Sequence, residues 1–186
     1  MVIRKLFKIE CAHIVRGCTT QRCSHNYHGH SAKIEVFLRA KNLDYAGMVM
    51  DFGRLKPIIS QFIDMFDHCI QLFKRDDKDC IEFFRKHNER YIILPFNPTA
   101  ENYALFFKYA INELLMRIQP TNGESDVYCS GVRYHETDTG YAEAEETDNC
   151  LYDITSVVVS KGCMKDAKEL TEFYNNEYNL WQVDRQ

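Results

Sequence analysis

The segment Cys23–Ser31, CSHNYHGHS, places one cysteine and three histidines within eight consecutive positions. Neutral imidazole nitrogen and thiolate sulfur are the donors that zinc prefers, usually in a tetrahedral shell. Three protein ligands leave one position open for water or substrate, whereas four ligands close the shell. The residue types in this segment therefore point to either a catalytic or a structural metal site.

The strands around this segment decide which histidines can meet. Alternation from His28 to Leu38 predicts a strand in which His28 and His30 point to the buried face. Weaker alternation from Ile3 to His13 predicts a preceding strand with His13 on its apolar face. If the two strands pair as a hairpin, the three histidines form a site with an open position, suited to Lewis-acid chemistry.

Two other interpretations stay open at this stage. An HGH pair alone is a weak signal, because most such histidines are surface or hydrogen-bonded residues. A closed structural zinc site could also form from a Cys2His2 set, namely Cys18, Cys23, His28 and His30. The protein would then be a binding module that unfolds on chelation. Cys23 itself is either a small filler residue or, beside a metal, a thiolate able to carry protons.

Acidic and histidine residues elsewhere could also take part in chemistry. Asp67 precedes His68, and a carboxylate there can fix the tautomer and raise the basicity of a proton-carrying imidazole. Glu136 ends an apolar strand, where its carboxylate is either solvated or accepts paired N–H bonds from a ring such as a pterin. Glu101 follows Thr99 in a first helical turn, where the helix dipole favours an acid in any case.

The remaining pattern predicts an α+β fold. Apolar stripes predict a helix from Leu55 to Phe66 and a second helix that Thr99 caps. Two strands follow, at about 126–136 and 139–146. The order β-β-α-α-β-β predicts a four-stranded antiparallel sheet with two helices on one face.

Two regions lie outside this pattern. Residues 74–90 are highly charged and are expected to form a short exposed helix or a loop. The tail offers a β-branched run, ITSVVVS, and a helical stretch whose expected face is Leu170, Phe173, Tyr174, Tyr178 and Trp181.

Composition excludes several classes of protein. The 186 residues carry a formal net charge of −4, without the basic excess of a general nucleic-acid or membrane-surface binder. No apolar run approaches the about 18 to 20 residues of a membrane helix, and the N-terminal sequence lacks the apolar centre of a signal peptide. We therefore expect a cytoplasmic protein whose eight cysteines are reduced thiols.

Six motifs in this chain, in their order, resemble one known family. They read AHIV, CSHNYHGHS, GMVMDF, FDHCIQL, NPTAEN and HETDTG, and they run from about residue 3 to 145. The set is similar to the 6-pyruvoyl-tetrahydropterin synthase family, and within it to the branch of 6-carboxytetrahydropterin synthases of queuosine biosynthesis. The resemblance implies a tunnelling fold (T-fold), in which three four-stranded subunits close a β-barrel without free edges and two trimers form a hexamer.

The resemblance also implies roles for single residues, with the proton-relay pair acting from a neighbouring subunit. The matched positions are, for zinc, His13, His28 and His30; for proton transfer, Cys23, Asp67 and His68; and for the pterin, Thr99, Glu101 and Glu136. The implied substrate is 7,8-dihydroneopterin triphosphate, and the implied products are 6-carboxy-5,6,7,8-tetrahydropterin, acetaldehyde and triphosphate. Arg16, Arg22 and Lys33 are near enough in sequence to help bind the triphosphate.

The chain departs from the family pattern in three places. Four residues separate Cys23 from His28. That spacing is intermediate between the carboxy and pyruvoyl types, so a 6-pyruvoyl product stays an alternative. His25 lies inside this loop and could compete as a proton carrier or metal neighbour. We expect residues 1–146 to form the T-fold domain, with an insert at 74–97, and residues 147–186 to form an extension packed on it.

Overall fold

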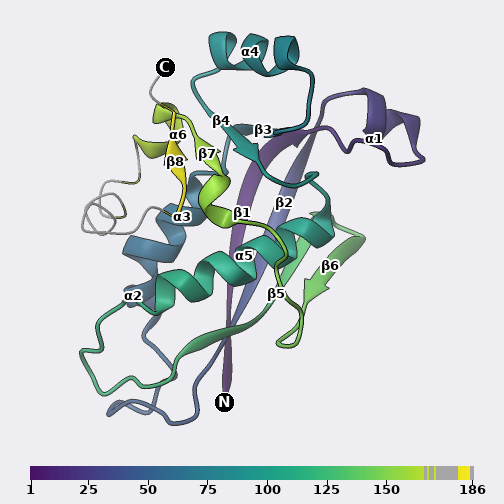
Figure 1. The fold of residues 1–186 in the computed structure, drawn as a ribbon. Helices are drawn as coiled ribbons and strands as arrows, with labels where there is room; N and C mark the ends of the chain where they lie inside the picture. The colour runs from purple at the N-terminus through teal and green to yellow at the C-terminus, as the bar shows by residue number, and fades with distance from the viewer. Residues whose placement is uncertain (166, 168–169, 171–179, 185–186) are drawn as a thin grey trace.

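The computed structural model describes residues 1–165, 167, 170 and 180–184. One mixed sheet of eight strands runs through them in the order β6-β5-β2-β1-β3-β4-β7-β8 (Figure 1). Its strands are β1 (Val2–His13), β2 (His28–Arg39), β3 (Cys69–Phe73), β4 (Tyr91–Leu94), β5 (Tyr128–Thr137), β6 (Gly140–Ala144), β7 (Val158–Val159) and β8 (Gln182–Val183). The helices are α1 (Gln21–His25), α2 (Phe52–Leu55), α3 (Gln61–Asp64), α4 (Lys78–His87), α5 (Ala100–Leu115) and α6 (Lys161–Met164).

The predicted hairpin of the two N-terminal strands is confirmed. β1 and β2 pair antiparallel along their whole length, from Val2 opposite Arg39 to His13 opposite His28. The apolar residues of β2 from Ala32 to Leu38 are buried on the face that the alternation predicts. A strand puts alternate side chains on one face, so this register carries both histidines of β2 to the face of His13.

The expectation of a purely antiparallel four-stranded sheet was wrong. β6, β5, β2 and β1 do form the four expected antiparallel strands, but β3 adds to β1 in parallel and β4 adds to β3 in parallel. The two added strands have the sequences CIQLF and YIIL. They are short apolar runs beside the charged stretch, so the sequence pattern did not predict them as strands. All four residues of β4 are buried, as is typical of a parallel strand covered on both faces.

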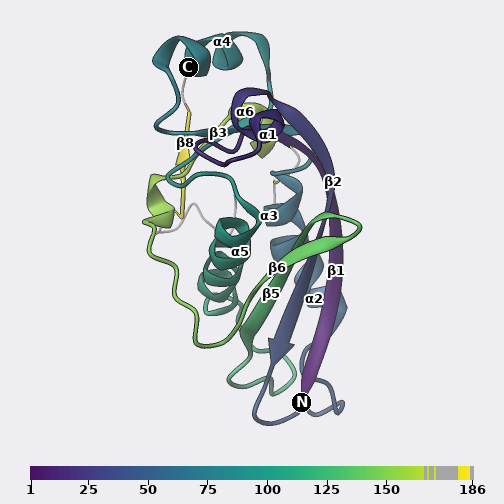
Figure 2. The ribbon, with the colours of Figure 1, turned by 90° about the vertical axis from the view of Figure 1, so that its right-hand side faces the viewer.

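The main helices cover one face of the sheet. Figure 2 shows α3 and α5 on the same side of the long strands β1 and β2. Thr99 caps α5 as predicted, with its hydroxyl accepting the Asn102 N–H at 3.3 Å. The α5 residues Tyr103, Phe107 and Ile111 are fully buried against the sheet. Burying an apolar side chain of this size contributes roughly 1.5–3 kcal/mol, so this stripe fixes the helix over the sheet.

The first predicted helix begins earlier than its apolar stripe. Asp51 caps α2 by accepting the Gly53 N–H at 2.7 Å, which places the start at Phe52. Pro57 therefore lies beyond the first turn. A π-helical turn at Lys56–Ser60 separates α2 from α3. Proline lacks the N–H of a regular α-helical bond, which is a physical reason for the irregular turn at this point.

The charged stretch and the tail both add to this sheet. The expected short helix in the charged stretch is α4. The ITSVVVS run supplies only the two-residue strand β7 and a 3-10 turn at Ile154–Ser156. Of the helical face expected in the tail, Phe173, Tyr174 and Tyr178 lie outside the described residues. The division into 1–146 and 147–186 stays a prediction, although strands from both parts share the sheet.

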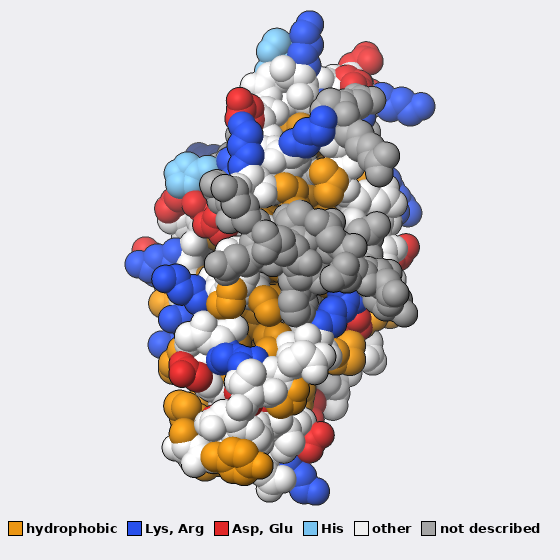
Figure 3. Space-filling model, turned by 90° about the vertical axis from the view of Figure 1, so that its left-hand side faces the viewer, with side chains coloured by type: hydrophobic (Ala, Val, Ile, Leu, Met, Phe, Trp, Pro, Cys, Tyr) orange, Lys and Arg blue, Asp and Glu red, His pale blue; other side chains and the backbone are white. Residues whose placement is uncertain are grey.

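Charged side chains of both signs lie on the outside of the molecule. On the face drawn in Figure 3, basic, acidic and apolar side chains are interspersed. In the part of the chain that the structure describes, no helix is long and apolar enough to cross a membrane.

Candidate metal and active site

The three histidines expected to bind metal meet at one end of the β1–β2 hairpin. His13 lies opposite His28, and Cys11 lies opposite His30. The three imidazole rings are arranged edge to face, with centroids 4.8, 4.9 and 5.0 Å apart. One ring nitrogen of each lies within 4.8 Å of the other two. Two neighbouring strands therefore supply three nitrogen donors on one face of the sheet.

Burial favours the neutral form of two of these imidazoles, those of His13 and His30. His13 is fully buried, and burial lowers its pKa from 6.5 to about 3, with the charges of His30 and His28 acting in the same direction. Burial also lowers the pKa of His30, against the opposing effect of Glu136. A neutral imidazole keeps the lone pair that a metal requires, so the electrostatics of the site favour metal binding over protonation.

Unpartnered nitrogen atoms give a second sign that the group fits a metal. Among the described residues, neither ring nitrogen of His13 has a partner at regular hydrogen-bond geometry, and the same holds for Nε2 of His30. Buried polar atoms in proteins are normally paired, so orphaned atoms call for a ligand. His28 Nδ1 lies 3.0 Å from the Asn26 carbonyl. A carbonyl only accepts, so Nδ1 carries the proton of that hydrogen bond. In a neutral ring Nε2 is then unprotonated and can bind a metal.

Glu136, at the end of β5, lies beside the triad. Its Oε1 is 3.4 Å from Nε2 of His13 and 3.9 Å from Nε2 of His30. Its side chain is 30% exposed and faces a hollow of about 490 Å³. The hollow is lined by Lys8, Glu10, Gly29, His30, Ser31, Ala32, Lys33, Glu136, Thr137 and Asp138. The carboxylate is thus placed to accept hydrogen bonds from a molecule bound next to the histidines.

Cys23 lies in α1, in the loop that joins β1 to β2. Its backbone carbonyl accepts the Val15 N–H at 2.9 Å, and its side chain is half-buried. The metal-binding group formed by the described residues contains neither Cys23 nor Cys18, so the Cys2His2 set is not assembled there. His25 Nδ1 lies 2.8 Å from the hydroxyl of its neighbour Ser24.

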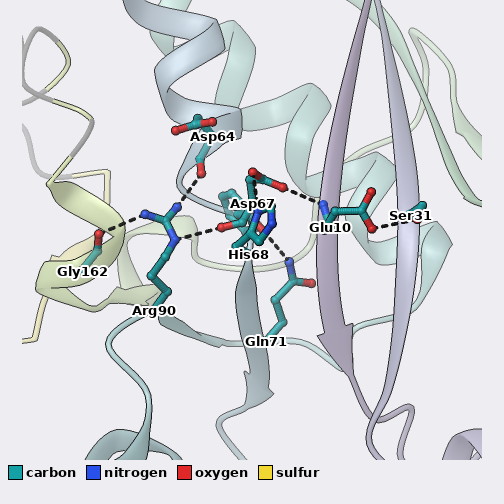
Figure 4. A network of polar contacts seen from close by, with 9 residues as sticks. Glu10, Ser31, Asp64, Asp67, His68, Gln71, Arg90 and Gly162 are labelled. Carbon is teal, nitrogen blue, oxygen red and sulfur yellow. Dashed lines mark hydrogen bonds and ion pairs between the residues drawn. The ribbon is translucent and has the colours of Figure 1, made fainter.

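Asp67 and His68 form a pair on the other side of β1. Asp67 Oδ2 lies 2.8 Å from His68 Nδ1, and Asp67 Oδ1 accepts the Glu10 N–H at 2.7 Å (Figure 4). The His68 N–H in turn donates to the Glu10 carbonyl at 2.6 Å. The ring of His68 is 72% exposed. Within the described structure no hydrogen bond or ion pair joins His68 to the histidine triad.

The two remaining predicted residues lie at the start of α5. Thr99 uses its hydroxyl as the helix cap. Glu101 is exposed in the first turn, and it makes no hydrogen bond or ion pair to another described residue. The structure places neither of them in the triad.

Several residues near the site carry no obvious signal in the sequence. The Tyr103 ring stacks on His13, with centroids 6.3 Å apart, and its hydroxyl donates to the buried Gln71 side chain.

Two basic residues considered for phosphate binding are already paired. Arg16 Nε is 2.6 Å from Asp76, and Lys33 Nζ is 2.5 Å from Asp138.

Comparison with known proteins gives the same family as the sequence motifs. The family model described as 6-pyruvoyl tetrahydropterin synthase matches residues 2–147. A Helicobacter pylori protein named 6-carboxy-5,6,7,8-tetrahydropterin synthase (strain J99) is 40% identical over 144 residues, which cover 77% of this chain and 72% of that protein. A Rickettsia bellii protein of the same name is 32% identical over 118 residues, covering 62% of this chain and 80% of its own.

Solved structures agree on the fold. The crystal structure of an uncharacterized protein from Wolinella succinogenes matches with a TM-score of 0.61 and 20% identity, over 78% of this chain and 97% of that one. The Caenorhabditis elegans 6-pyruvoyl tetrahydropterin synthase matches with a TM-score of 0.54 and 22% identity, over 78% and 94%. The α+β fold of this chain thus matches that of solved synthases. Together with the family model and the Helicobacter relative, this shows that the chain belongs to the 6-pyruvoyl tetrahydropterin synthase family.

Proposed function

We propose that this chain is a zinc-dependent 6-carboxy-5,6,7,8-tetrahydropterin synthase of queuosine biosynthesis, the activity named for its relatives in Helicobacter. The observation that carries the proposal is the triad. His13, His28 and His30 stand on paired strands. Buried nitrogens of His13 and His30 have no hydrogen-bond partner among the described residues, and the Glu136 carboxylate lies 3.4 and 3.9 Å from them. Three imidazole donors suit zinc, and a three-ligand site keeps a position open for chemistry.

The proposed substrates are 7,8-dihydroneopterin triphosphate and one water, and the products are 6-carboxy-5,6,7,8-tetrahydropterin, acetaldehyde and triphosphate. Zinc, when bound by the three histidines, would supply a Lewis acid that acidifies the hydroxyls and adjoining C–H bonds of the substrate side chain. Glu136 would accept hydrogen bonds from the N–H edge of the pterin ring and orient it beside the triad. Thr99 and Glu101 are proposed to lie near the pterin pocket.

Proton transfer is proposed to use Cys23 on one face of the substrate and His68 on the other. Asp67 contacts Nδ1 of His68 at 2.8 Å, so a proton on Nδ1 would be held there. Nε2 of His68 would then be free to accept and return a proton, which is the tautomer that a general base needs.

The exposed position of His68 supports a homo-oligomer. Its ring is 72% exposed, in the turn before β3, the strand that borders β1 on the edge opposite β2. A trimer of T-folds, stacked into a hexamer, would let the Asp67–His68 pair of one subunit serve the triad of its neighbour. In this arrangement residues 1–146 act as the T-fold domain, with the insert at 74–97 and the extension at 147–186 on its outside.

A 6-pyruvoyl-tetrahydropterin synthase, which eliminates triphosphate without cleaving the side chain, is the second candidate. The spacing of four residues between Cys23 and His28 is the feature that keeps this candidate in view. A non-catalytic zinc module is disfavoured, because the Cys18 and Cys23 thiols lie outside the metal-binding group.

Removal and return of the metal tests the proposal. The protein is stripped with a chelator, reloaded with zinc, and incubated with 7,8-dihydroneopterin triphosphate without a reductase. We expect 6-carboxytetrahydropterin by mass spectrometry only in the reloaded sample. Full activity in the stripped sample would exclude the metal, and absence of any pterin product after reloading would exclude the enzyme.

A further inference from the structure

Arg90, the residue before β4, connects three segments that are far apart in the chain. Its guanidinium donates to the Asp67 carbonyl at 2.9 Å, to the Asp64 carbonyl at 2.7 Å and to the Gly162 carbonyl at 3.0 Å (Figure 4). Asp64 ends α3, Asp67 lies in the turn before β3, and Gly162 belongs to α6. One planar cation thus satisfies carbonyls at the end of a helix, in a tight turn and in the C-terminal part.

The turn that Arg90 holds is the one that presents His68. His68 has a φ of 49°, in the left-handed region that residues other than glycine rarely adopt. Such a conformation persists only where the surroundings fix it. Here the turn is hydrogen-bonded to the Glu10 backbone on one side. Asp67 Oδ1 accepts the Glu10 N–H, and the His68 N–H donates to the Glu10 carbonyl. Arg90 bonds it on the other side, through the Asp67 carbonyl.

The third carbonyl is held in place by close packing of α6. A Cβ atom added to Gly162 would lie 2.1 Å from the Glu89 carbonyl oxygen, so only glycine fits there. The Ser160 hydroxyl contacts that same Glu89 carbonyl at 2.8 Å, and it lies 3.1 Å from the Tyr91 N–H. The C-terminal part is therefore fixed to the backbone on both sides of Arg90.

We propose that Arg90 is a positioning residue for His68, and that α6 shares this role through the Gly162 carbonyl. The inference deepens the proposed function, since it assumes that His68 carries protons. A guanidinium can serve all three carbonyls at fixed angles, whereas an ammonium on a flexible stem cannot. Without the guanidinium the turn keeps only its two hydrogen bonds to the Glu10 backbone, and the left-handed conformation is held on one side alone. The orientation of the imidazole toward the substrate is then less well defined.

The first test is kinetic. Because displacement of a catalytic group by about 1 Å can cost 10²-fold, we expect Arg90→Ala to lower kcat about 10- to 100-fold. KM should change less than about threefold, since Arg90 acts on the turn and not on the substrate. Arg90→Lys should recover part of kcat. An unchanged kcat in Arg90→Ala would overturn the proposal.

A double-variant cycle separates positioning from general loosening. In a His68→Gln background, Arg90→Ala should cause little further loss of kcat, because the group that it positions is already gone. Losses that multiply would show that Arg90 acts independently of His68 and would overturn the proposal. Arg85→Ala is the matched control. It breaks an ion pair of 2.6 Å with Asp184 of the tail, and we expect kcat within twofold of the unmodified protein.

A second readout does not need enzymatic activity. The His68 N–H bonds the Glu10 carbonyl, so its hydrogen exchange reports on the turn directly. We expect exchange at His68 to be at least tenfold faster in Arg90→Lys and in Gly162→Ala, but unchanged in Arg85→Ala. Equal exchange in all variants would refute the positioning role. If exchange responds as expected while the unmodified protein makes no pterin product, then only the proposed function fails.

Discussion

His13 and His28 lie directly opposite each other on the ladder between β1 and β2, with their ring centroids 4.8 Å apart. This pairing turns two separate sequence motifs into one group of donors, because the register also carries His30 to the same face. A shift by one residue would send both histidines of β2 to the opposite face of the sheet. The hairpin register is therefore what builds the proposed metal site.

Substituting a triad residue should strongly weaken metal binding. We expect His28→Ala to bind zinc at least 100-fold more weakly, because the site loses one of three ligands. Zinc content after dialysis, measured by atomic emission, tests this. Cys18→Ala is the matched control and should keep a full complement of zinc. The reverse pattern, with zinc lost only in Cys18→Ala, would support the Cys2His2 site instead.

Removing the thiol of Cys23 should affect turnover and not assembly. General acid–base groups contribute about 10²- to 10⁴-fold, so Cys23→Ala should lose that much of kcat while keeping zinc and oligomeric state. Steady-state kinetics, metal content and light scattering measure the three properties. His25→Ala is the neighbouring control and should stay active. Retained turnover in Cys23→Ala would move the proton-transfer role to His25 or to metal-bound water.

The carboxylate of Asp67 should matter through His68. An amide at this position can accept the Glu10 N–H but does not stabilise an imidazolium as a carboxylate does. We expect Asp67→Asn to lower kcat about 10- to 100-fold with little change in KM, because the amide does not stabilise the imidazolium that proton transfer would form on His68. Steady-state kinetics of both proteins measure this, and an unchanged kcat in Asp67→Asn would argue against a relay.

The metal-free protein should lose stability as the pH falls. His13 has its pKa lowered to about 3 in the folded state, whereas the unfolded chain has the ordinary value of 6.5. The unfolded state therefore binds the proton first, and the free energy of unfolding decreases from about pH 6.5 down to about pH 3. Between pH 7 and pH 5 this amounts to about 2 kcal/mol.

Urea unfolding of chelated protein at the two pH values measures this decrease. In His13→Gln the pH dependence should be weaker by about that amount, because glutamine does not titrate. Equal dependence in the two proteins would contradict the burial of a neutral His13. Zinc should not remove the effect in the unmodified protein, because metal-bound His13 also carries no added proton and the unfolded chain still takes one up.

The sequence could predict the parts of the fold that repeat a local pattern. Alternation of apolar and polar residues predicted which side chains of β1 and β2 are buried. The capping residue Thr99 and the apolar stripe after it predicted α5. β3 was missed because it is a short apolar run beside a charged segment, and its parallel pairing with β1 depends on long-range contacts. β7 and β8 have two residues each, too few to show any period.

The candidate site also has a part that the sequence could predict and a part that it could not. The histidines of the triad share a face by strand geometry, which is a local property. The Arg90 network could not be predicted, because its three acceptors are backbone carbonyls, which every residue has. Glu136 was proposed as a substrate anchor, and its closeness to His13 became visible only with β5 placed beside β2.

The most direct test of the account is the stoichiometry of products. The zinc-loaded protein is given 7,8-dihydroneopterin triphosphate without a reductase, and acetaldehyde and triphosphate are measured in the same sample. The account predicts equal amounts of both, together with 6-carboxytetrahydropterin, and neither product with His28→Ala. Triphosphate released without acetaldehyde, with a 6-pyruvoyl pterin formed instead, would contradict it.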